Sequence, residues 1–322
     1  MRRSTLLAFL LVLALAPTAG ADSFAPPAGR VMNGVAGGHS VSDFAARTGA
    51  APAVVQSFVY YGSSTNWAFD LAEHAGARVM LHIGTTSSSG AERVTPAGIA
   101  QGKEDRWLAA LNGAIAQRGE PVYIRLMAEM NCHWNAYSAY GPHHNAAHST
   151  KAFRAAWRRT TIILRGGPNV DAQLRAIHQR PLQAGGDLPP APVAMQWVPQ
   201  VEGAPAVAGN SPMSYWPGAR YVDWVGTDFY SKFPNFSGLE RFYASVHHLH
   251  KPFVFGEWAV WGADNPSFVQ RLFSWTRSHS LVRMLVYNQG KYSDGPFRLS
   301  RYPRSTRVLR GLLNLSRFRF TV

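Results

Sequence analysis

The sequence predicts an α/β protein of one domain, in which eight parallel strands and the helices between them close into a (β/α)8 TIM barrel. Apolar stretches alternate with amphipathic stretches along the 322 residues, a pattern typical of a parallel sheet. Two apolar stretches, Pro121–Asn135 and Lys251–Trp261, each present a glutamate, Glu129 and Glu257, where the strand is expected to end. Strand ends so far apart in the sequence meet in a closed barrel, which gathers them at one mouth.

The first residues have the pattern of a signal peptide. Arg2 and Arg3 precede an apolar run, Leu6–Ala16, that is too short to span a bilayer, and a small-residue cleavage site, Ala19–Ala21, follows it. We therefore expect residues 1–21 to be removed and residues 22–322 to form the catalytic barrel. The protein is expected to be secreted or held in the cell envelope, without a stable membrane anchor.

The eight expected strands are rich in β-branched, aromatic and large aliphatic residues, as strands buried on both faces are. In chain order they are Val31–Ala36, Ala53–Tyr60, Arg78–Ile83, Pro121–Ala128, Val193–Val198, Tyr221–Phe229, Pro252–Phe255 and Val282–Asn288.

The segments between the strands show helical spacing of apolar residues or a capping residue at their start. The expected helices are Ser40–Arg47, Asn66–His74, Lys103–Arg118, Thr150–Arg165, Leu239–His250, Pro266–Ser278 and Ser305–Leu315. The Pro/Gly-rich segments Gln183–Pro192 and Val201–Pro217 are short enough to be loops, so no linker divides the chain.

The charge of the chain predicts attraction to anionic surfaces. The formal net charge is +14, and an anionic cell-wall polymer or an anionic membrane surface would each be attracted by it. The arginines are dispersed or lie on expected helices, as Arg154, Arg158 and Arg159 do, without a compact basic motif, so we expect no nucleic-acid partner. Cys132 is the single cysteine, so an internal disulfide is excluded and a large apolar core must provide stability.

The two glutamates suit glycoside hydrolysis. In a retaining glycosidase one carboxyl group protonates the leaving oxygen and the other attacks the sugar carbon, with the pair about 5–5.5 Å apart. Each glutamate also has a purely structural interpretation, since Glu129 could pair with Arg125 and Glu257 could form a salt bridge or cap a helix. The presence of two strand-end carboxylates favours the catalytic interpretation, which requires no cofactor.

Two other sites can be read from the sequence. His133, His143, His144 and His148 form a cluster in which the last two are spaced for one face of a helix, but no glutamate follows His144 to serve as a base, so no metal site is expected. Cys132 beside His133 suggests a thiol nucleophile, yet neighbouring residues of an extended chain point in opposite directions.

Four motifs carry a resemblance to a known family. They are RLMAEMNCHW around Glu129, YWPGARYVDWVGTDFY from Tyr215 to Tyr230, KPFVFGEWAVWG around Glu257, and the spacing of Val94–Trp107. In this order they resemble glycoside hydrolase family 26, the β-mannanase family of the retaining barrel glycosidases, over nearly the whole chain after the signal peptide.

This resemblance implies a secreted hydrolase that cleaves β-1,4-mannan or a related β-linked polysaccharide. Glu129 would be the acid/base and Glu257 the nucleophile, with Tyr230 as its hydrogen-bond donor. The implied sugar-binding residues are His82, Trp134, Asp228, Trp258 and Trp261. Tyrosine and tryptophan are frequently buried, so packing in the core is the alternative for each of the aromatic residues, and at least one tryptophan is expected there.

The sequence departs from the family pattern at two positions. Ala128 stands where the family usually has a histidine before the acid/base, and Tyr287-Asn288 stands where an aromatic platform is usual. The alternative function is therefore a carbohydrate-binding pseudoenzyme with weakened catalysis. A metal hydrolase that uses the histidine cluster is a third interpretation.

Overall fold

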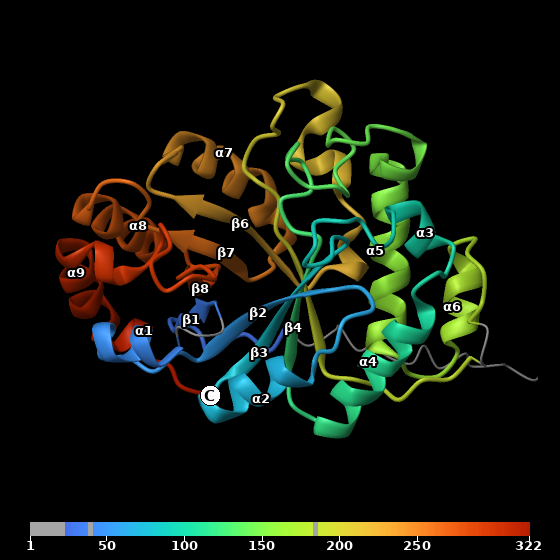
Figure 1. Cartoon of the computed structure of the whole chain (residues 1–322), viewed down its shortest axis with the longest axis horizontal. Coiled ribbons are helices and arrows are strands. Elements are labelled where there is room, and N and C mark those ends of the chain that lie inside the picture. The colour runs from blue at the N-terminus through green and yellow to red at the C-terminus, as the bar shows by residue number, and fades with distance from the viewer. Residues whose placement is uncertain (1–22, 38–40, 183–185) are drawn as a thin grey trace, which may run out of the picture.

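Eight parallel strands form a closed barrel in the computed structural model (Figure 1). The structure describes residues 23–37, 41–182 and 186–322, so the expected signal peptide, residues 1–21, lies outside the described residues. Each strand pairs with the next along the chain, and β8 pairs with β1. The strands are β1 Met32–Ala36, β2 Val54–Tyr60, β3 Arg78–Gly84, β4 Val122–Leu126, β5 Val193–Trp197, β6 Trp224–Tyr230, β7 Phe253–Ala259 and β8 Val282–Asn288. The predicted fold class is confirmed.

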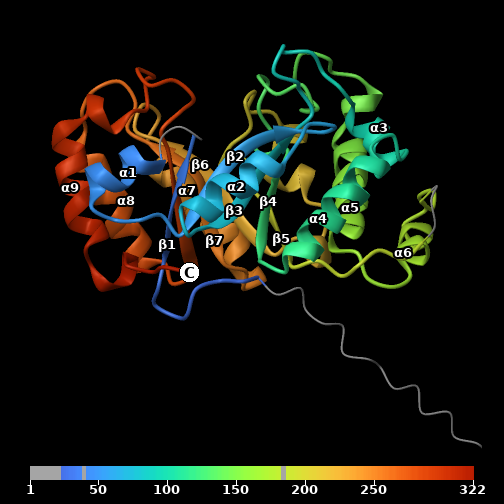
Figure 2. The same ribbon diagram turned by 60° about the horizontal axis from the view of Figure 1, so that its bottom comes forward.

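Helices surround the strands on the outside of the barrel (Figures 1 and 2). They are α1 Val41–Thr48, α2 Asn66–His74, α3 Pro96–Ala100, α4 Asp105–Arg118, α5 Thr150–Arg165, α6 Val170–Ala176, α7 Phe236–Val246, α8 Pro266–Ser278 and α9 Pro303–Leu313. Several begin at a side chain that accepts a hydrogen bond from the first turn: Ser149 caps α5, Asn235 caps α7 and Asn265 caps α8. Helices α3 and α6 were not expected from the sequence.

Strand β7 is longer than the sequence predicted. It continues past Phe255 through Glu257 to Ala259, and its register against β6 shifts between Thr227 and Asp228, which places Asp228 opposite Glu257. A shift of this kind is a β-bulge, and bulges often redirect a side chain beside an active site. The expected strand end at Phe255 was therefore wrong, and Glu257 lies within the strand.

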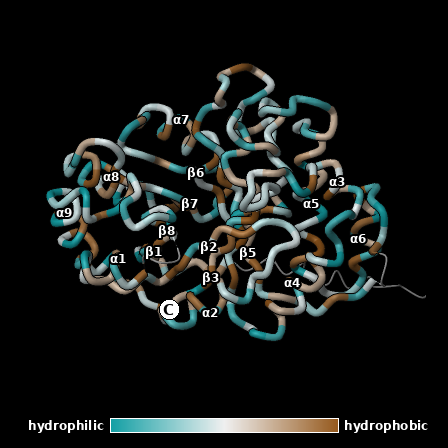
Figure 3. Tube along the Cα trace, viewed as in Figure 1, coloured by the Kyte–Doolittle hydropathy of each residue, from teal (hydrophilic) through white to brown (hydrophobic). Residues whose placement is uncertain are grey.

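The core has an inner part within the barrel and an outer part between the strands and the helices. Inside the barrel, Tyr123 and Trp224 pack edge to face with their ring centroids 5.7 Å apart, among other buried apolar side chains. The larger outer part joins the other face of each strand to the helices. Hydrophobic segments accordingly follow the strands, and hydrophilic ones are commoner in the outer turns (Figure 3). Every residue of β4 is buried, as the predicted interior strand requires.

The segment at the start of the described chain lies across the N-terminal end of the barrel. The indole of Trp224 donates to the carbonyl of Ser23 at 2.6 Å, and the hydroxyl of Tyr123 donates to the carbonyl of Phe24 at 2.7 Å. These contacts leave the opposite end, where the strands terminate, as the mouth. Among the described helices, none combines the length and the apolar character that crossing a bilayer requires.

Candidate active site

Glu129 lies just beyond β4 in a backbone conformation that few side chains adopt. The φ angles of Met127 and Glu129 are 40° and 52°, in the left-handed region that L-residues occupy at a cost. The surrounding chain holds this conformation, since the amide of Glu129 donates to the carbonyl of Val198 at 2.7 Å and the side chain of Asn135 donates to the carbonyl of Glu129 at 2.9 Å. Strained backbone that is held by hydrogen bonds is common at functional sites. Here this conformation directs the side chain of Glu129 across the mouth of the barrel.

Two neutral donors orient the carboxylate of Glu129. The indole Nε1 of Trp134 donates to Oε2 at 2.8 Å, and Nε2 of Gln200 donates to Oε1 at 2.7 Å. Trp134 is 53% exposed, so its ring also offers an open face beside the carboxylate. The position of Trp134 agrees with the implied sugar-binding role, because a flat aromatic face can stack on a sugar ring.

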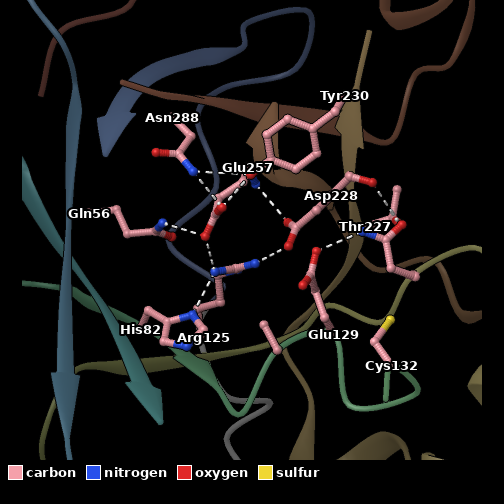
Figure 4. A network of polar contacts seen from close by, with 12 residues as sticks. Gln56, His82, Arg125, Glu129, Cys132, Thr227, Asp228, Tyr230, Glu257 and Asn288 are labelled. Carbon is pink, nitrogen blue, oxygen red and sulfur yellow. Dashed lines mark hydrogen bonds and ion pairs between the residues drawn. The ribbon is translucent and has the colours of Figure 1, made fainter. Parts of the chain in front are cut away.

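Glu257 receives donors from four other strands (Figure 4). Its Oε1 accepts from Nη1 of Arg125 at 2.6 Å and from Nε2 of Gln56 at 3.3 Å. Its Oε2 accepts from the hydroxyl of Tyr230 at 2.5 Å and from Nδ2 of Asn288 at 2.7 Å. The expected contact from Tyr230 is therefore present. A carboxylate held at both oxygens by partners on β2, β4, β6 and β8 has a fixed position.

Arg125 is the buried cation at the centre of this network. Besides Glu257 it contacts Asp228, and it is 1% exposed. Burial lowers the pKa of Arg125, but the carboxylates of Asp228 and Glu257 outweigh burial and raise that pKa above its ordinary value. The alternative in which Glu129 pairs with Arg125 was wrong, because the ion pairs of this guanidinium are with Asp228 and Glu257.

Asp228 supports the same network from β6. Its Oδ1 accepts the backbone amide of Glu257 at 2.8 Å, and its Oδ2 contacts Arg125. Burial raises the pKa of Asp228 well above its ordinary value, the Arg125 guanidinium opposes the rise, and the negative charge of Glu257 adds to it. Asp228 is thus a buried partner of Arg125 and Glu257, although it also lines the cavity described below.

Gly256 makes room for the arginine. A Cβ atom at this position would lie 2.6 Å from Nε of Arg125 and 3.0 Å from Oδ1 of Asp228. Cβ atoms do not tolerate contacts of 2.6 Å, so a larger residue would displace the guanidinium. The glycine before Glu257 therefore has a structural reason that the sequence motif alone does not reveal.

His82 ends this chain of contacts on β3. Its Nδ1 lies 2.6 Å from Nη1 of Arg125, and because a guanidinium only donates, Nδ1 must be the unprotonated nitrogen. Burial, together with the charge of Arg125, lowers the pKa of His82 well below 6.5. His82 is consequently a neutral imidazole whose Nε2 carries the proton and can donate to a ligand.

Two cavities adjoin the network. One of about 550 Å³ is lined by both glutamates and by Tyr230, with Trp134 and Trp261 on its walls. A second of about 560 Å³ is lined by His82, Phe58 and Trp67. Each volume is within the usual range for a small-molecule site, and both contain aromatic side chains that suit carbohydrate.

One implied sugar-binding residue lies elsewhere. Trp258 is 2% exposed and packs edge to face on Tyr287 and Phe273, with ring centroids 4.8 Å and 5.7 Å apart. Its side chain leaves β7 on the face opposite to that of Glu257, toward the helices. The prediction that Trp258 stacks on a sugar is wrong, and Trp258 is the core tryptophan that was expected among the three. Trp261, by contrast, does line the glutamate cavity.

The alternative sites find little support. His148 is buried and bonds Glu92 at 2.8 Å through Nε2, whereas Nδ1 of His144 contacts the carbonyl of Ala139. Within the described ranges no group of three or more His, Cys, Asp or Glu side chains could hold a metal ion. Cys132 is buried, and burial raises its thiol pKa, so the thiolate that a nucleophile needs is disfavoured.

Several residues of the site were not found from the sequence. Gln56, Gln200 and Asn288 contact the two glutamates, but an isolated amide carries no motif. The available signal was position: Gln56 is a polar residue inside an apolar strand, and Asn288 ends the eighth strand. Arg125 offered a stronger signal, since a buried strand that contains an arginine must supply it with carboxylates.

Comparisons with known proteins bear on the fold. No family model matches the chain, and no curated protein matches it by sequence. Solved structures do match. A glycoside hydrolase family 26 β-mannanase from Bacteroides ovatus, BoMan26A, has 14% identity and a TM-score of 0.61, with 90% of each chain covered.

Two further mannanases give similar results. The Bacillus subtilis mannanase BCman has 14% identity and a TM-score of 0.57, with 87% of this chain and 85% of that chain covered. The modular endo-β-1,4-mannanase of Cellulomonas fimi has 13% identity and a TM-score of 0.58, with 90% and 72% covered. The resemblance stated from the sequence motifs is thus confirmed at the level of the fold: this chain has the barrel fold of the glycoside hydrolase family 26 mannanases.

Proposed function

We propose that this protein is a secreted retaining β-glycoside hydrolase, a distant member of glycoside hydrolase family 26, that cleaves β-1,4-mannan or a related β-linked polysaccharide. The observation that carries the proposal is that Glu129, just after β4, and Glu257, within β7, line one cavity with aromatic walls. A pair of carboxyl groups that flank the glycosidic bond is what glycoside hydrolysis needs, and the resemblance to a retaining family favours retention. The fold shared with mannanases supports mannan as the first substrate to test.

In the proposed first step the carboxylate of Glu257 attacks the anomeric carbon. The carboxyl group of Glu129 gives its proton to the glycosidic oxygen as the C–O bond breaks, which leaves a glycosyl ester on Glu257. In the second step water attacks the same carbon and loses its proton to Glu129, and Glu257 leaves as a carboxylate. Configuration is retained because both steps invert it.

Neighbouring residues would serve this reaction by holding the nucleophile. Tyr230 and Asn288 donate to the Oε2 atom of Glu257, while Arg125 donates to Oε1. An oxygen held in this way is preorganised to face the sugar carbon, which lowers the cost of orientation. No cofactor takes part in these steps.

Ala128 favours a second candidate, a carbohydrate-binding pseudoenzyme. Its side chain is 1% exposed and belongs to the apolar cluster inside the barrel, so position 128 offers no polar group to a substrate. In this case the cavities would bind sugar without cleaving it. Both candidates bind sugar, but only the enzyme cleaves it.

One experiment separates the candidates. The protein expressed from residue 22 is assayed for released reducing sugar on β-mannan, mixed-linkage β-glucan and xylan, and binding of the matching oligosaccharides is measured by calorimetry. Hydrolysis of at least one polymer, lost in Glu257→Ala, supports the enzyme. Binding without hydrolysis of any polymer supports the pseudoenzyme, and neither binding nor hydrolysis contradicts both.

A further inference from the structure

The positive charge of the chain is concentrated in its last elements. Residues 266–322, which include α8, β8 and α9, contain eleven lysines and arginines and one acidic residue, Asp294. The 265 residues before them contain 21 basic and 17 acidic residues. Most of the net charge of +14 therefore comes from one flank of the barrel, where α8 and α9 lie beside α1 and away from α4, α5 and α6 (Figure 1).

An arginine row lies on the outer side of α9 and of the turn before it. Arg301, Arg304, Arg307 and Arg310 recur every third residue, and all four are exposed. Residues three apart on a helix are neighbours, so these side chains repel one another unless an anion lies between them. No acidic side chain in the described part of the chain forms an ion pair with any of the four.

A groove of about 560 Å³ lies between α1 and α9, and the last two arginines of the row, Arg307 and Arg310, reach it. Arg47, Arg307 and Arg310 line it, together with one acid, Asp43, and the hydroxyl-bearing residues Ser300 and Thr306. Arg310 is fixed there, because its Nε and Nη2 each donate at 2.9 Å to carbonyls in the last turn of α1. Guanidinium groups held in a groove can bind a carboxylate or phosphate with two parallel hydrogen bonds.

The acids near the groove already have hydrogen-bond partners. Asp43 contacts Arg47 at 2.7 Å and Arg298 at 3.5 Å. Asp264 accepts the backbone amides of Arg304 and Ser305 at 2.9 Å each, at the N-terminus of α9. Arg307 forms no ion pair within the described residues, so its guanidinium is available to a ligand, whereas Arg310 adds its charge while its Nε and Nη2 remain bonded to α1.

We propose that the arginine row and the α1–α9 groove form a binding surface for a linear acidic polysaccharide, a glycan that carries carboxylate or phosphate groups. The row matches a chain with recurring negative charges, and the groove hydroxyls and guanidinium groups can bind sugar hydroxyls between them. The exposed positions of α9 carry no aromatic residue on which nucleic-acid bases could stack, which favours a glycan over single-stranded nucleic acid. This surface is separate from the glutamate cavity, and the inference does not depend on the proposed hydrolysis.

The test uses calorimetry at several salt concentrations with two probes, polygalacturonate and phosphorylated dextran, and with neutral dextran as the blank. The triple variant Arg301→Gln, Arg304→Gln, Arg307→Gln keeps Arg310, whose bonds hold α1. The matched control, Arg106→Gln, Lys151→Gln, Arg175→Gln, removes the same charge from α4, α5 and α6 on the opposite flank. Thermal unfolding of both variants is compared with that of the parent protein to check the fold.

The parent should bind an acidic probe and leave neutral dextran unbound. The row variant should bind roughly tenfold or more weakly. Its affinity should also depend less steeply on salt concentration, because binding with fewer arginine contacts releases fewer counterions. The control variant should lose less than about twofold, since dispersed surface charge acts only at long range. Binding to one probe alone identifies carboxylate or phosphate as the recognised group.

Three results would overturn the proposal. They are equal affinity of the row variant and the parent, an equal loss in the two triple variants, and tighter row-dependent binding of a DNA duplex or of phosphatidylglycerol vesicles than of either glycan. The second result would mean that net charge alone attracts the polymer. The third would assign the surface to nucleic acid or to a membrane.

Discussion

Arg125 and Glu257 are joined by a hydrogen bond of 2.6 Å in the centre of the barrel, and the same guanidinium contacts Asp228. One buried cation thus contacts two carboxyl groups that come from the adjacent strands β6 and β7. Without the cation the two buried carboxyl groups would lie together with nothing to offset their burial and mutual repulsion, so the contacts of Arg125 hold this part of the site together.

Replacing this cation should damage both stability and activity. Arg125→Gln leaves Asp228 and Glu257 buried without their counter-charge, and removal of one partner from a buried ion pair costs about 3–5 kcal/mol. Denaturant unfolding of the variant should show a loss of that size, together with loss of turnover. The exposed Arg118→Gln is the control. If Arg125→Gln unfolds like the parent, the network does not stabilise the barrel.

Gly256→Ala tests the close approach of the arginine to β7. The added methyl group would lie 2.6 Å from Nε of Arg125, so the guanidinium must move and Glu257 loses its position. We expect turnover to fall by about tenfold or more, as small displacements at a catalytic site can do. Gly113→Ala, whose added Cβ meets nothing within 4 Å, should keep the parental rate. Full activity of Gly256→Ala would show that the arginine is free to shift.

Glu129→Ala tests the acid/base. Substrates with poor leaving groups need a proton and should slow by roughly a hundredfold or more, whereas activated aryl glycosides should slow less in forming the glycosyl ester. Azide should then restore turnover of the activated substrates. Glu202→Ala is the matched control, because Glu202 lines the same cavity and pairs at 2.6 Å with the exposed Arg241. An equal loss on both substrate types, without azide rescue, would give Glu129 a different role.

His82 predicts a specific dependence of stability on pH. Its pKa is lowered well below 6.5 in the folded protein, so below about pH 6.5 the unfolded chain binds a proton there that the native state does not. The contribution of the neutral His82 to the free energy of unfolding is fully present above that pH and decreases as the pH falls. The free energy of unfolding of the parent should drop by up to about 1.4 kcal/mol per pH unit more than that of His82→Gln between pH 6.5 and 5. The exposed His248→Gln should follow the parent, and parallel curves for all three proteins would refute the neutral imidazole.

The sequence predicted the barrel because its apolar strands alternate with helices and two of them present an acid. It could not predict that β7 continues through Glu257, since the bulge opposite Asp228 is a property of two paired strands. Nor did it separate Trp258 from Trp261, which lie three residues apart in one motif: Trp258 lies within β7 and packs toward the helices, whereas Trp261 follows the strand and lines the cavity.

The amide side chains that donate hydrogen bonds to Glu257 could not be predicted from the sequence either. Gln56 and Asn288 lie far from Glu257 in the sequence, and barrel closure brings β2 and β8 to it. The contact from Tyr230, in contrast, was expected from the motif on β6. Local motifs therefore predicted the residues near the strand ends, whereas the network around Arg125 depends on the closed sheet.

Covalent labelling tests directly whether Glu257 is the nucleophile. The protein is incubated with activated 2-deoxy-2-fluoro-β-mannosides and β-glucosides of mono- and oligosaccharides, and the modified residue is located by mass spectrometry of its peptides. The account predicts one glycosyl group per chain, attached as an ester to Glu257 and absent in Glu257→Gln. A label on another residue, or a wild-type protein that hydrolyses a β-glycan while Glu257→Gln retains its rate, would contradict it.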